Sequence, residues 1–449
     1  MHISVVGLGK LGAPLVAVLA SKGFHVTGAD KIPAQVAALE AHRAPVAEPG
    51  LGQLIAQSAA RIEATTDVKR AVVGSEVTFV VVPTPSGKDG KFSNAHVLSA
   101  MHEIGGALRG KSGYHLVVVT STVMPGATGG PIRHALETAC GRPVGPDLGL
   151  CYNPEFIALG NVIHDMLNPD FVLIGESDKR AGDLLASIYA RVCDNRPQLR
   201  RMNLVNAEVT KIAVNSFVTT KISFANMVSE ICDRLHDADA GEVLRAVGSD
   251  SRIGGKYLAP ALGYGGPCFP RDNAAFTSLA RAAGASADIA EATDVINRRQ
   301  VARVVKLVRS LLPRGTVGVL GLSYKPDTAV VEESQGIAIA SQLSGKGYHV
   351  IAHDPLAGDT AHAVLGTAVE VTAEPETCVA RADILVIATP WPNYKNIPPA
   401  AFRRERQQLI VIDCWRLLPL DQFSEVADIV HLGKGSAPGQ QPYAAVAIA

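Results

Sequence analysis

Residues 1–30 read MHISVVGLGKLGAPLVAVLASKGFHVTGAD and contain the pattern that decides the fold. An apolar run ending in Val5-Val6 is typical of a buried strand, and the glycine turn Gly7-Leu8-Gly9-Lys10-Leu11-Gly12 follows it directly. A helical stretch then runs through Ala20, and a second apolar run comes shortly before Asp30. This succession of strand, glycine turn, helix and strand predicts a βαβ unit.

Each glycine of this turn has its own role. Gly7 makes the tight turn, Gly9 lets the backbone approach a pyrophosphate, and Gly12 lets helix and strand pack closely. The helix N-terminus adds free N–H groups and a positive dipole for the phosphates. A glycine turn without a ligand is the alternative for the pattern taken alone. Asp30 favours NAD, because a carboxylate there would accept hydrogen bonds from the ribose and repel a 2′-phosphate.

Two further predicted strands, at residues 77–82 and 116–119, are each followed within three residues by a threonine, Thr84 and Thr122. Ligands of open sheets lie beyond the carboxyl ends of the strands. We therefore expect Thr84 and Thr122 to line the nicotinamide side of a cofactor. The alternative is that these threonines cap the helices that follow them.

The same rhythm restarts in the second half of the chain and predicts a second α/β domain. Its expected strands are 317–321, 350–355, 384–388 and 410–413. Residues from about 203 to 235 contain no Pro or Gly and carry many apolar side chains. They predict one long helix, apolar on more than one face, which spans between the domains and packs against a second subunit.

These patterns give an α/β fold with two Rossmann-like doubly wound domains joined by a long central helix. We expect an NAD-binding domain at 1–200, a central helical dimerisation region at 201–305 and a C-terminal α/β domain at 306–449. The chain of 449 residues is long enough for two or three domains.

Composition excludes several classes of partner. Lys plus Arg and Asp plus Glu both number 42, so no net charge recruits nucleic acid or an acidic membrane. The N-terminus lacks a signal-peptide pattern, and no apolar run is long enough to span a membrane.

Seven scattered cysteines without CxxC pairs indicate reduced thiols in the cytoplasm and no metal site. The tail from Gly433 is rich in Gly, Ala, Pro and Gln and is expected to be loose.

The most informative stretch for chemistry is GYGGPCFPRD at residues 263–272. Three glycines would bring its backbone close to a ligand, and Arg271 and Asp272 stand beside Cys268. A cationic neighbour favours the nucleophilic thiolate of a cysteine. A small buried hydrophobe is the alternative, and we prefer it for the other six cysteines.

On the predicted long helix, Lys211 and Asn215 share one face because they are four residues apart. A lysine and an amide placed in this way could stabilise an oxyanion. A solvated lysine and an asparagine that packs against another helix are the alternative.

Six motifs, in this order, resemble those of the UDP-glucose/GDP-mannose dehydrogenase family, and the resemblance covers nearly the whole chain. They are Gly7 to Gly12, Ser121-Thr122-Val123, Asn153-Pro154-Glu155-Phe156, Ala207-Glu208 with Lys211 and Asn215, the loop of Cys268, and Gly321-Leu322-Ser323-Tyr324-Lys325-Pro326. The resemblance implies that a nucleotide sugar is oxidised at its C6 hydroxyl to the carboxylate, by two hydride transfers to two NAD molecules.

The resemblance also implies roles for individual residues. Cys268 would attack the C6 aldehyde to give a thiohemiacetal and then a thioester. Lys211 and Asn215 would stabilise oxyanions, Asp272 would activate or position the hydrolytic water, and Glu155 and Thr122 would order that water and assist proton transfer. The implied cofactor contacts are Gly7, Gly9, Leu11, Gly12, Asp30, Thr84, Thr122 and Arg271. The implied substrate contacts are Phe156, Lys211, Arg252, Tyr257, Leu258, Gly265, Lys325 and Arg416. Arg252 would reach in from a neighbouring subunit, so a homodimer with a shared substrate site is expected.

Three positions depart from the family pattern. Leu159 stands where many members have a second glutamate, so Glu155 must order the water without it or another group replaces that carboxylate. Glu332 replaces an arginine that is common before Glu-Ser, and Trp415 stands where an arginine often follows Asp-Gly. These departures leave the substrate open. UDP-glucose is our first expectation, with a UDP-N-acetylhexosamine or GDP-mannose as the alternative.

Two other classes compete with this reading. A two-electron 3-hydroxyacid or 6-phosphogluconate-type dehydrogenase shares the first sheet and a long helix, but it needs neither the cysteine loop nor a second α/β domain. A non-catalytic NAD-binding regulatory protein is favoured only by Leu159 and Glu332, and the presence of Cys268, Lys211, Asn215 and Asp272 opposes it.

Overall fold

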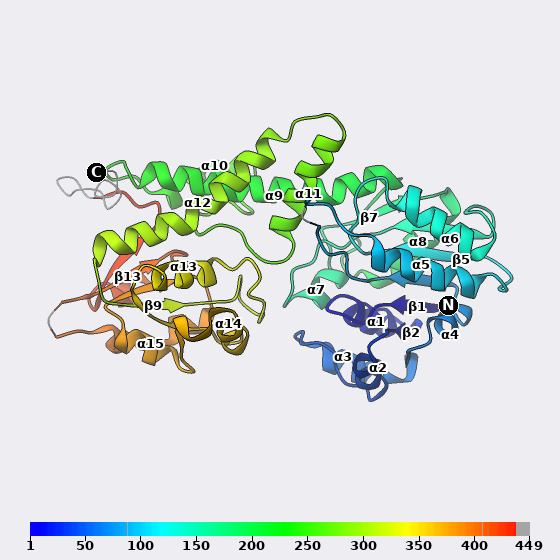
Figure 1. The fold of residues 1–449 in the computed structure, drawn as a ribbon, viewed down its shortest axis with the longest axis horizontal. Coiled ribbons are helices and arrows are strands. Elements are labelled where there is room, and N and C mark those ends of the chain that lie inside the picture. Colours follow the sequence, from blue (N-terminus) through cyan, green and yellow to red (C-terminus); the bar gives the residue numbers. More distant parts are fainter. Residues whose placement is uncertain (88, 406, 437–449) are drawn as a thin grey trace. The chain divides into compact units, whose positions relative to one another are not determined.

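The computed structural model describes residues 1–87, 89–405 and 407–436 and divides into two compact units, Met1–Ala213 and Val214–Ala449 (Figure 1). The start of the predicted loose tail is tied down. The Gly433 N–H donates to Asp233 Oδ1 at 2.7 Å, and the Gly435 N–H donates to the Ala238 carbonyl at 2.8 Å. The rest of that tail, residues 437–449, lies outside the described residues. Within the described ranges, no helix is long and apolar enough to cross a membrane.

The first unit is built on an eight-stranded sheet with the order β3-β2-β1-β4-β5-β6-β7-β8. The strands from β3 to β6 are parallel, in the order typical of dinucleotide-binding folds. Strands β7 and β8 run the opposite way, since β6 and β7 pair antiparallel. The strands are β1 His2–Val6, β2 His25–Ala29, β3 Ile62–Thr65, β4 Val77–Val80, β5 His115–Val119, β6 Leu148–Tyr152, β7 Phe171–Glu176 and β8 Gln198–Asn203.

Helices cover both faces of this sheet because alternate residues of a strand point to opposite sides. In β5, Leu116 and Val118 join the core packed under α1 and α8, whereas Val117 and Val119 join the core under α5 and α6. The doubly wound arrangement predicted from the sequence is therefore confirmed. The helices are α1 Gly12–Ser21, α2 Pro33–Glu40, α3 Leu51–Ser58, η1 Ala59–Arg61, α4 Val68–Val73, α5 Ala95–Leu108, η2 Thr128–Ile132, α6 Arg133–Cys140, α7 Val162–Leu167 and α8 Lys179–Val192.

The predicted long helix is α9, Leu204–Cys232, which begins in the first unit and ends in the second. Within the second unit its buried side is mainly polar. It carries Ser216, Thr219, Ser223, Asn226 and Ser229 beside the small apolar residues Ala225 and Cys232. The polar side chains bond to their neighbours, as when Asn226 Nδ2 donates to the Leu262 carbonyl at 3.0 Å. Four large apolar residues of this half, Phe217, Phe224, Met227 and Ile231, are exposed.

The second unit contains a six-stranded parallel sheet with the order β11-β10-β9-β12-β13-β14, which repeats the arrangement of the first. This repetition confirms the second Rossmann-like domain. The strands are β9 Thr316–Leu320, β10 His349–His353, β11 Glu370–Val371, β12 Ile384–Ile387, β13 Leu409–Asp413 and β14 Ala427–His431. The helices are α10 Ala240–Ser249, α11 Phe269–Ala282, α12 Asp288–Leu311, α13 Gln335–Ser344, α14 Gly358–Leu365, η3 Gly366–Ala368, α15 Pro375–Arg381, η4 Pro392–Asn396, η5 Pro399–Phe402 and α16 Leu420–Phe423.

Candidate active site

The glycine turn after β1 has the geometry that its sequence predicts. Gly7 has a φ of +102°, which favours glycine, and a Cβ on it would lie 2.2 Å from the Val81 carbonyl oxygen. A Cβ on Gly12 would lie 1.8 Å from the Gly7 carbonyl oxygen, so helix and turn pack directly. A Cβ on Gly9 would meet no protein atom within 4 Å. Packing alone therefore demands glycine at Gly7 and Gly12, while Gly9 borders space that suits a close-lying phosphate.

Asp30 follows β2 and is held by backbone donors. Its Oδ2 accepts from the Leu8 N–H at 2.6 Å, and its Oδ1 accepts from the Ile32 N–H at 2.8 Å. The carboxylate is thus fixed beside the glycine turn, and each oxygen keeps a second lone pair for another donor. These residues fit a dinucleotide whose pyrophosphate lies at the start of α1 and whose ribose hydroxyls donate to Asp30. Leu11, also predicted to touch the cofactor, is the N-cap residue of α1.

Thr84 and Thr122 lie beyond the carboxyl ends of β4 and β5. The two strand ends are joined by Ser121, whose hydroxyl accepts from the Val82 N–H at 2.9 Å and donates to the Val82 carbonyl at 2.7 Å. Neither threonine caps a helix, because the next helices begin after Asn94 and Ala127. The capping alternative is therefore wrong, and the prediction that both threonines line a ligand stays open.

Glu155 and Lys211 come together in the first unit. Lys211 is buried, its Nζ donates to the Glu155 carbonyl at 2.7 Å, and it lies 4.6 Å from the centre of the Phe156 ring. The Glu155 side chain faces Tyr189 of α8, with 3.1 Å between Oε1 and the hydroxyl oxygen. Burial raises the pKa of Glu155 to about 7. A carboxyl with such a pKa can accept or donate a proton near neutral pH.

The second unit holds the cysteine and its neighbours. Cys268 is the N-cap residue of α11 and is exposed, whereas the other six cysteines are buried. One turn further on, the fully buried Asp272 accepts from Asn215 Nδ2 at 2.6 Å through Oδ2, and from Arg271 at 2.9 and 3.0 Å through Oδ1. The helix N-terminus favours an anion at Cys268. The solvated-lysine and helix-packing alternatives therefore do not describe Lys211 and Asn215 fully, since both are buried and bonded to other predicted site residues.

The glycines of the cysteine loop are explained first by protein neighbours. A Cβ on Gly265 would lie 2.2 Å from the Glu333 carbonyl oxygen, and one on Gly266 would lie 2.5 Å from the Tyr324 ring. The Gly266 N–H also donates to the Glu332 carbonyl at 3.1 Å. The loop thus packs tightly on the segment that follows β9, which is the segment that carries Lys325.

The remaining predicted substrate residues have different settings. Tyr257 is about half exposed with a φ of +64°, an unusual conformation for a non-glycine residue, and Leu258 beside it is buried. Arg252 is exposed and pairs with Asp250 at 2.6 Å. Arg416 pairs with Asp239 at 2.7 Å, next to the start of α10.

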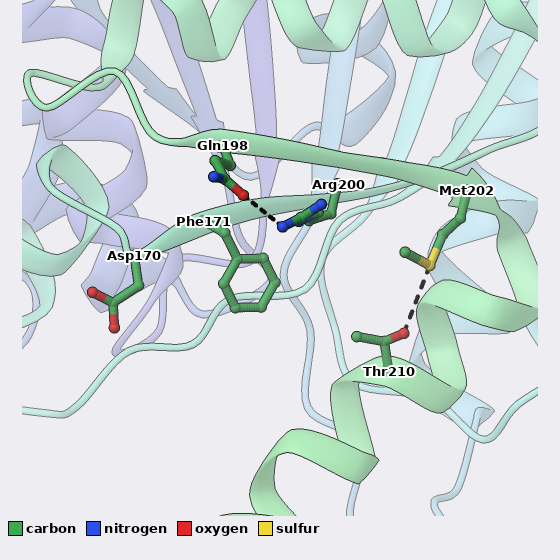
Figure 2. A pocket seen from close by; sticks show the side chains of 6 residues that line it. All are labelled: Asp170, Phe171, Gln198, Arg200, Met202 and Thr210. Carbon is green, nitrogen blue, oxygen red and sulfur yellow. Dashed lines mark hydrogen bonds between the residues drawn. The ribbon is translucent and has the colours of Figure 1, made fainter. Parts of the chain in front are cut away.

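A hollow on the first unit contains none of the predicted residues (Figure 2). Its lining comes from β7, β8 and α9 and the residue before β7: Asp170, Phe171, Gln198, Arg200, Met202 and Thr210. Figure 2 shows that Arg200 bonds to Gln198 and that Thr210 donates to the Met202 sulfur. We assign this hollow no part in the chemistry. In the described residues, no group of three His, Cys, Asp or Glu side chains could hold a metal ion.

Sequence reasoning missed one residue of the Glu155 cluster. Tyr189 stands on α8, thirty-four residues after Glu155, in a stretch whose sequence is that of an ordinary amphipathic helix. No motif marked it, since its contact with Glu155 arises only when α8 packs on the sheet.

Comparison with known proteins gives the same picture over nearly the whole chain. Residues 1–193, 205–299 and 318–419 match the NAD binding, central and UDP binding domains of the UDP-glucose/GDP-mannose dehydrogenase family. The chain is 34% identical over 416 residues to a UDP-glucose 6-dehydrogenase from Haloferax volcanii, covering 92% of this chain and 96% of that protein. It is 35% identical over 354 residues to a GDP-mannose 6-dehydrogenase from Pseudomonas aeruginosa, covering 78% and 80%. A solved UDP-glucose dehydrogenase from Pyrobaculum islandicum superposes with a TM-score of 0.87 at 33% identity, covering 100% and 98%.

Proposed function

The chain belongs to the UDP-glucose/GDP-mannose dehydrogenase family of NAD-dependent oxidoreductases, and we propose that it oxidises the C6 hydroxyl of a UDP-sugar to the carboxylate. UDP-glucose is the first candidate, because the UDP-glucose 6-dehydrogenase from Haloferax volcanii aligns over more of the chain than the GDP-mannose enzyme does. A UDP-N-acetylhexosamine or GDP-mannose is the alternative.

One observation carries this proposal: the exposed Cys268 stands at the start of α11, one turn before the buried pair of Asp272 and Asn215. Oxidation of an alcohol to an aldehyde requires no sulfur nucleophile. Oxidation of that aldehyde to an acid is assisted by a covalent carrier, because the thiohemiacetal carbon bears the hydrogen that leaves as hydride. The cysteine setting therefore supports a four-electron reaction over a two-electron one.

The side chains around Cys268 have separate roles in this scheme. The Cys268 thiolate adds to the C6 aldehyde, and the thioester that forms after the second oxidation is hydrolysed by water. Asp272 orients that water, and the Asn215 amide, which Asp272 holds in place, stabilises the oxyanion together with Lys211. Glu155 carries a proton to or from the reacting oxygen with the help of Thr122.

The cofactor would be held by Gly7, Gly9, Leu11 and Gly12 at the pyrophosphate, by Asp30 at the ribose, and by Thr84, Thr122 and Arg271. When bound, NAD accepts the hydride in each of the two oxidations. The substrate would be held by Phe156, Lys211, Tyr257, Leu258, Gly265, Lys325 and Arg416, and by Arg252 of a second copy.

A homodimer is the second part of the proposal. The exposed side of α9 presents Phe217, Phe224 and Ile231, which are seven residues apart and therefore form one stripe. On the opposite side of the helix, Ser216, Ser223 and Asn226 already form hydrogen bonds within their own unit. A stripe of large apolar side chains on a helix fits a second copy of the same helix. Since the proposed substrates and NAD are metabolites of the cytoplasm, and all seven cysteines are free thiols, we place the enzyme there.

The function is tested by incubating the protein with NAD and a panel of UDP- and GDP-sugars and measuring NADH formed per sugar consumed. Two NADH per sugar is the expected result. One NADH per sugar would indicate a two-electron dehydrogenase, and the absence of NADH with every sugar would favour a non-catalytic NAD-binding protein.

A further inference from the structure

The loop that leads to Cys268 takes hydrogen bonds for its backbone from asparagine side chains. In the described structure, residues 259–265 lie outside every helix and strand, so their buried backbone groups need other partners. The first contact comes from Asn226 of α9, which is itself buried. Its Oδ1 accepts from the Ala261 N–H at 3.2 Å, and its Nδ2 donates to the Leu262 carbonyl at 3.0 Å.

The second contact comes from Asn297 of α12 and has the same form. Asn297 Oδ1 accepts from the Tyr264 N–H at 2.8 Å, and Asn297 Nδ2 donates to the Tyr264 carbonyl at 3.0 Å. Because an N–H only donates and a carbonyl only accepts, both bonds require an amide and fix its orientation. A Cβ on Gly263 would lie 2.3 Å from Asn297 Oδ1. Glycine at this position therefore lets the Asn297 amide reach the backbone of the loop.

Tyr264 connects this contact with the cysteine. Its side chain is buried, and its hydroxyl donates to Asp294, which stands one turn before Asn297 on α12. The Tyr264 ring meets the Phe269 ring edge-on, with 6.4 Å between the ring centres. Phe269 directly follows Cys268 and is the first residue of α11. Helix α12 thus holds the backbone and the hydroxyl of a tyrosine that packs against the neighbour of Cys268.

We propose that Asn226 and Asn297 are positioning residues that fix this loop, so that Cys268 captures the aldehyde before it can leave the site. They act through the backbone of the loop and do not have to touch the substrate. Two helices hold the loop at two places, which restrains it more than either contact alone. The inference rests on the proposed function, in which Cys268 adds to the aldehyde made by the first oxidation.

The test uses Asn297→Asp in the full chain, because aspartate has nearly the same shape as asparagine. Its carboxylate still accepts from the Tyr264 N–H. It cannot donate to the Tyr264 carbonyl, and two oxygens then face each other where an N–H···O bond stood. The change therefore releases one side of the contact and leaves the volume of the side chain unchanged.

The two oxidations should respond differently to this release. The first oxidation needs no sulfur, whereas the second proceeds through the thiohemiacetal on Cys268. A misplaced thiol should slow acid formation by about 10–100-fold, and part of the aldehyde should escape. We expect the NADH formed per sugar consumed to fall from two toward one. Free aldehyde should appear in the protein-free filtrate, where an alkoxyamine probe converts it to an oxime that mass spectrometry detects.

Gln300→Glu is the matched control, since it also exchanges an amide for an acid on α12. Gln300 is buried, and its Nε2 donates to Glu230 at 2.8 Å and to the Ile296 carbonyl at 3.1 Å. This variant disturbs the same helix without touching the loop. A general loss of stability lowers both oxidations together, so Gln300→Glu should still give two NADH per sugar and no free aldehyde.

Hydrogen exchange followed by NMR or mass spectrometry tests the contacts without turnover. The Ala261 and Tyr264 amides should exchange slowly in the wild type, and the Tyr264 amide should exchange faster in Asn297→Asp but not in Gln300→Glu. If Asn297→Asp does not fold, Asn226→Asp makes the same change at the other contact and should also release aldehyde.

Three results would overturn the inference: two NADH per sugar without free aldehyde in the folded Asn variant, equal aldehyde release by Gln300→Glu, or fast exchange of both amides in the wild type. A wild-type protein that gives no NADH with any sugar would remove the proposed function. Slow exchange of the two amides in that protein would still leave the asparagine contacts with the loop standing.

Discussion

Glu155 is predicted to destabilise the fold at neutral pH, and Glu155→Gln should remove this cost. Its pKa is raised by burial from an ordinary value of 4.5 to about 7. Below pH 4.5 the carboxyl is protonated in the folded and unfolded chains alike, so it costs nothing. Between pH 4.5 and 7 the unfolded chain ionises first, and the free energy of unfolding falls. Above pH 7 the full cost is present.

The size of the effect follows from the shift. A difference of about 2.5 in pKa, at about 1.4 kcal/mol for each pKa unit, gives about 3.5 kcal/mol. Because Glu155 is not fully excluded from solvent, we expect a gain of about 2 kcal/mol for Glu155→Gln at pH 8 and none at pH 4.5. Glutamine keeps the shape of the side chain and offers Tyr189 an N–H donor, as the protonated acid does.

The assay is hydrogen exchange in increasing urea, followed by mass spectrometry of peptides from residues 148–176, which contain β6 and β7. Tryptophan fluorescence would not report this region, since Trp391 and Trp415 both belong to the second unit. Glu137→Gln is the opposite-sign control. Burial alone would raise the pKa of Glu137, but hydrogen bonds from Arg133 and Val144 hold it below its ordinary value, so this variant should lose stability at pH 8. Equal stability of Glu155→Gln and wild type at pH 8 would refute the reasoning.

Three further outcomes are expected. Cys268→Ser should lose steady-state turnover by roughly three orders of magnitude or more, because a neutral hydroxyl adds poorly to the aldehyde and gives a slowly hydrolysed ester. The intact mass of this variant should show a retained sugar adduct, and the control Cys140→Ala should behave as wild type. Acid formation by Cys268→Ser at the normal rate would contradict covalent catalysis. Asp30→Ala should weaken NAD binding by about 10–100-fold and reduce the preference for NAD over NADP, since a charged acceptor of the ribose hydroxyls is lost. Equal use of both cofactors by the wild type would contradict the assignment of Asp30 to the ribose. Arg252→Ala should raise the KM for the UDP-sugar and leave the KM for NAD unchanged. Light scattering of the wild type should show a dimer. A fully active monomer would contradict both the shared substrate site and the α9 interface.

The parts of the fold that local rules determine could be predicted from the sequence. Gly7 has to adopt a positive φ, Gly12 has to lack a Cβ, and Asp30 has to follow a strand directly. Each requirement is met within a few residues of the chain. The alternation of strands and helices then gives the doubly wound sheet. The buried side of α9 also leaves a signal in the sequence, because Ser216, Thr219, Ser223 and Asn226 recur at helical spacing.

The contacts that depend on packing could not be predicted in this way. The sequence predicts that Asn215 acts on the substrate, yet its amide also donates to Asp272 at 2.6 Å, a pairing that needs α11 to lie against α9. Tyr189 meets Glu155 only because α8 packs on the same side of the sheet as the segment after β6. A contact between two single side chains leaves no repeated spacing in the sequence, so no pattern predicts it.

The two sheets show why the same backbone geometry does not give the same ligand. Gly321 has the same φ of +102° as Gly7, and a Cβ on Gly336 would lie 2.1 Å from the Gly321 carbonyl oxygen, as Gly12 does with Gly7. Asp354 follows β10 as Asp30 follows β2. However, Asp354 Oδ2 accepts from the Ser323 N–H and hydroxyl, from Leu322 and from Trp391, and its Oδ1 accepts from Leu356 and Ala357. A carboxylate with six protein donors has no capacity left for a ribose, whereas each oxygen of Asp30 accepts from one backbone N–H, that of Leu8 or that of Ile32. Hydrogen-bond capacity at the second strand therefore decides which sheet can take a dinucleotide.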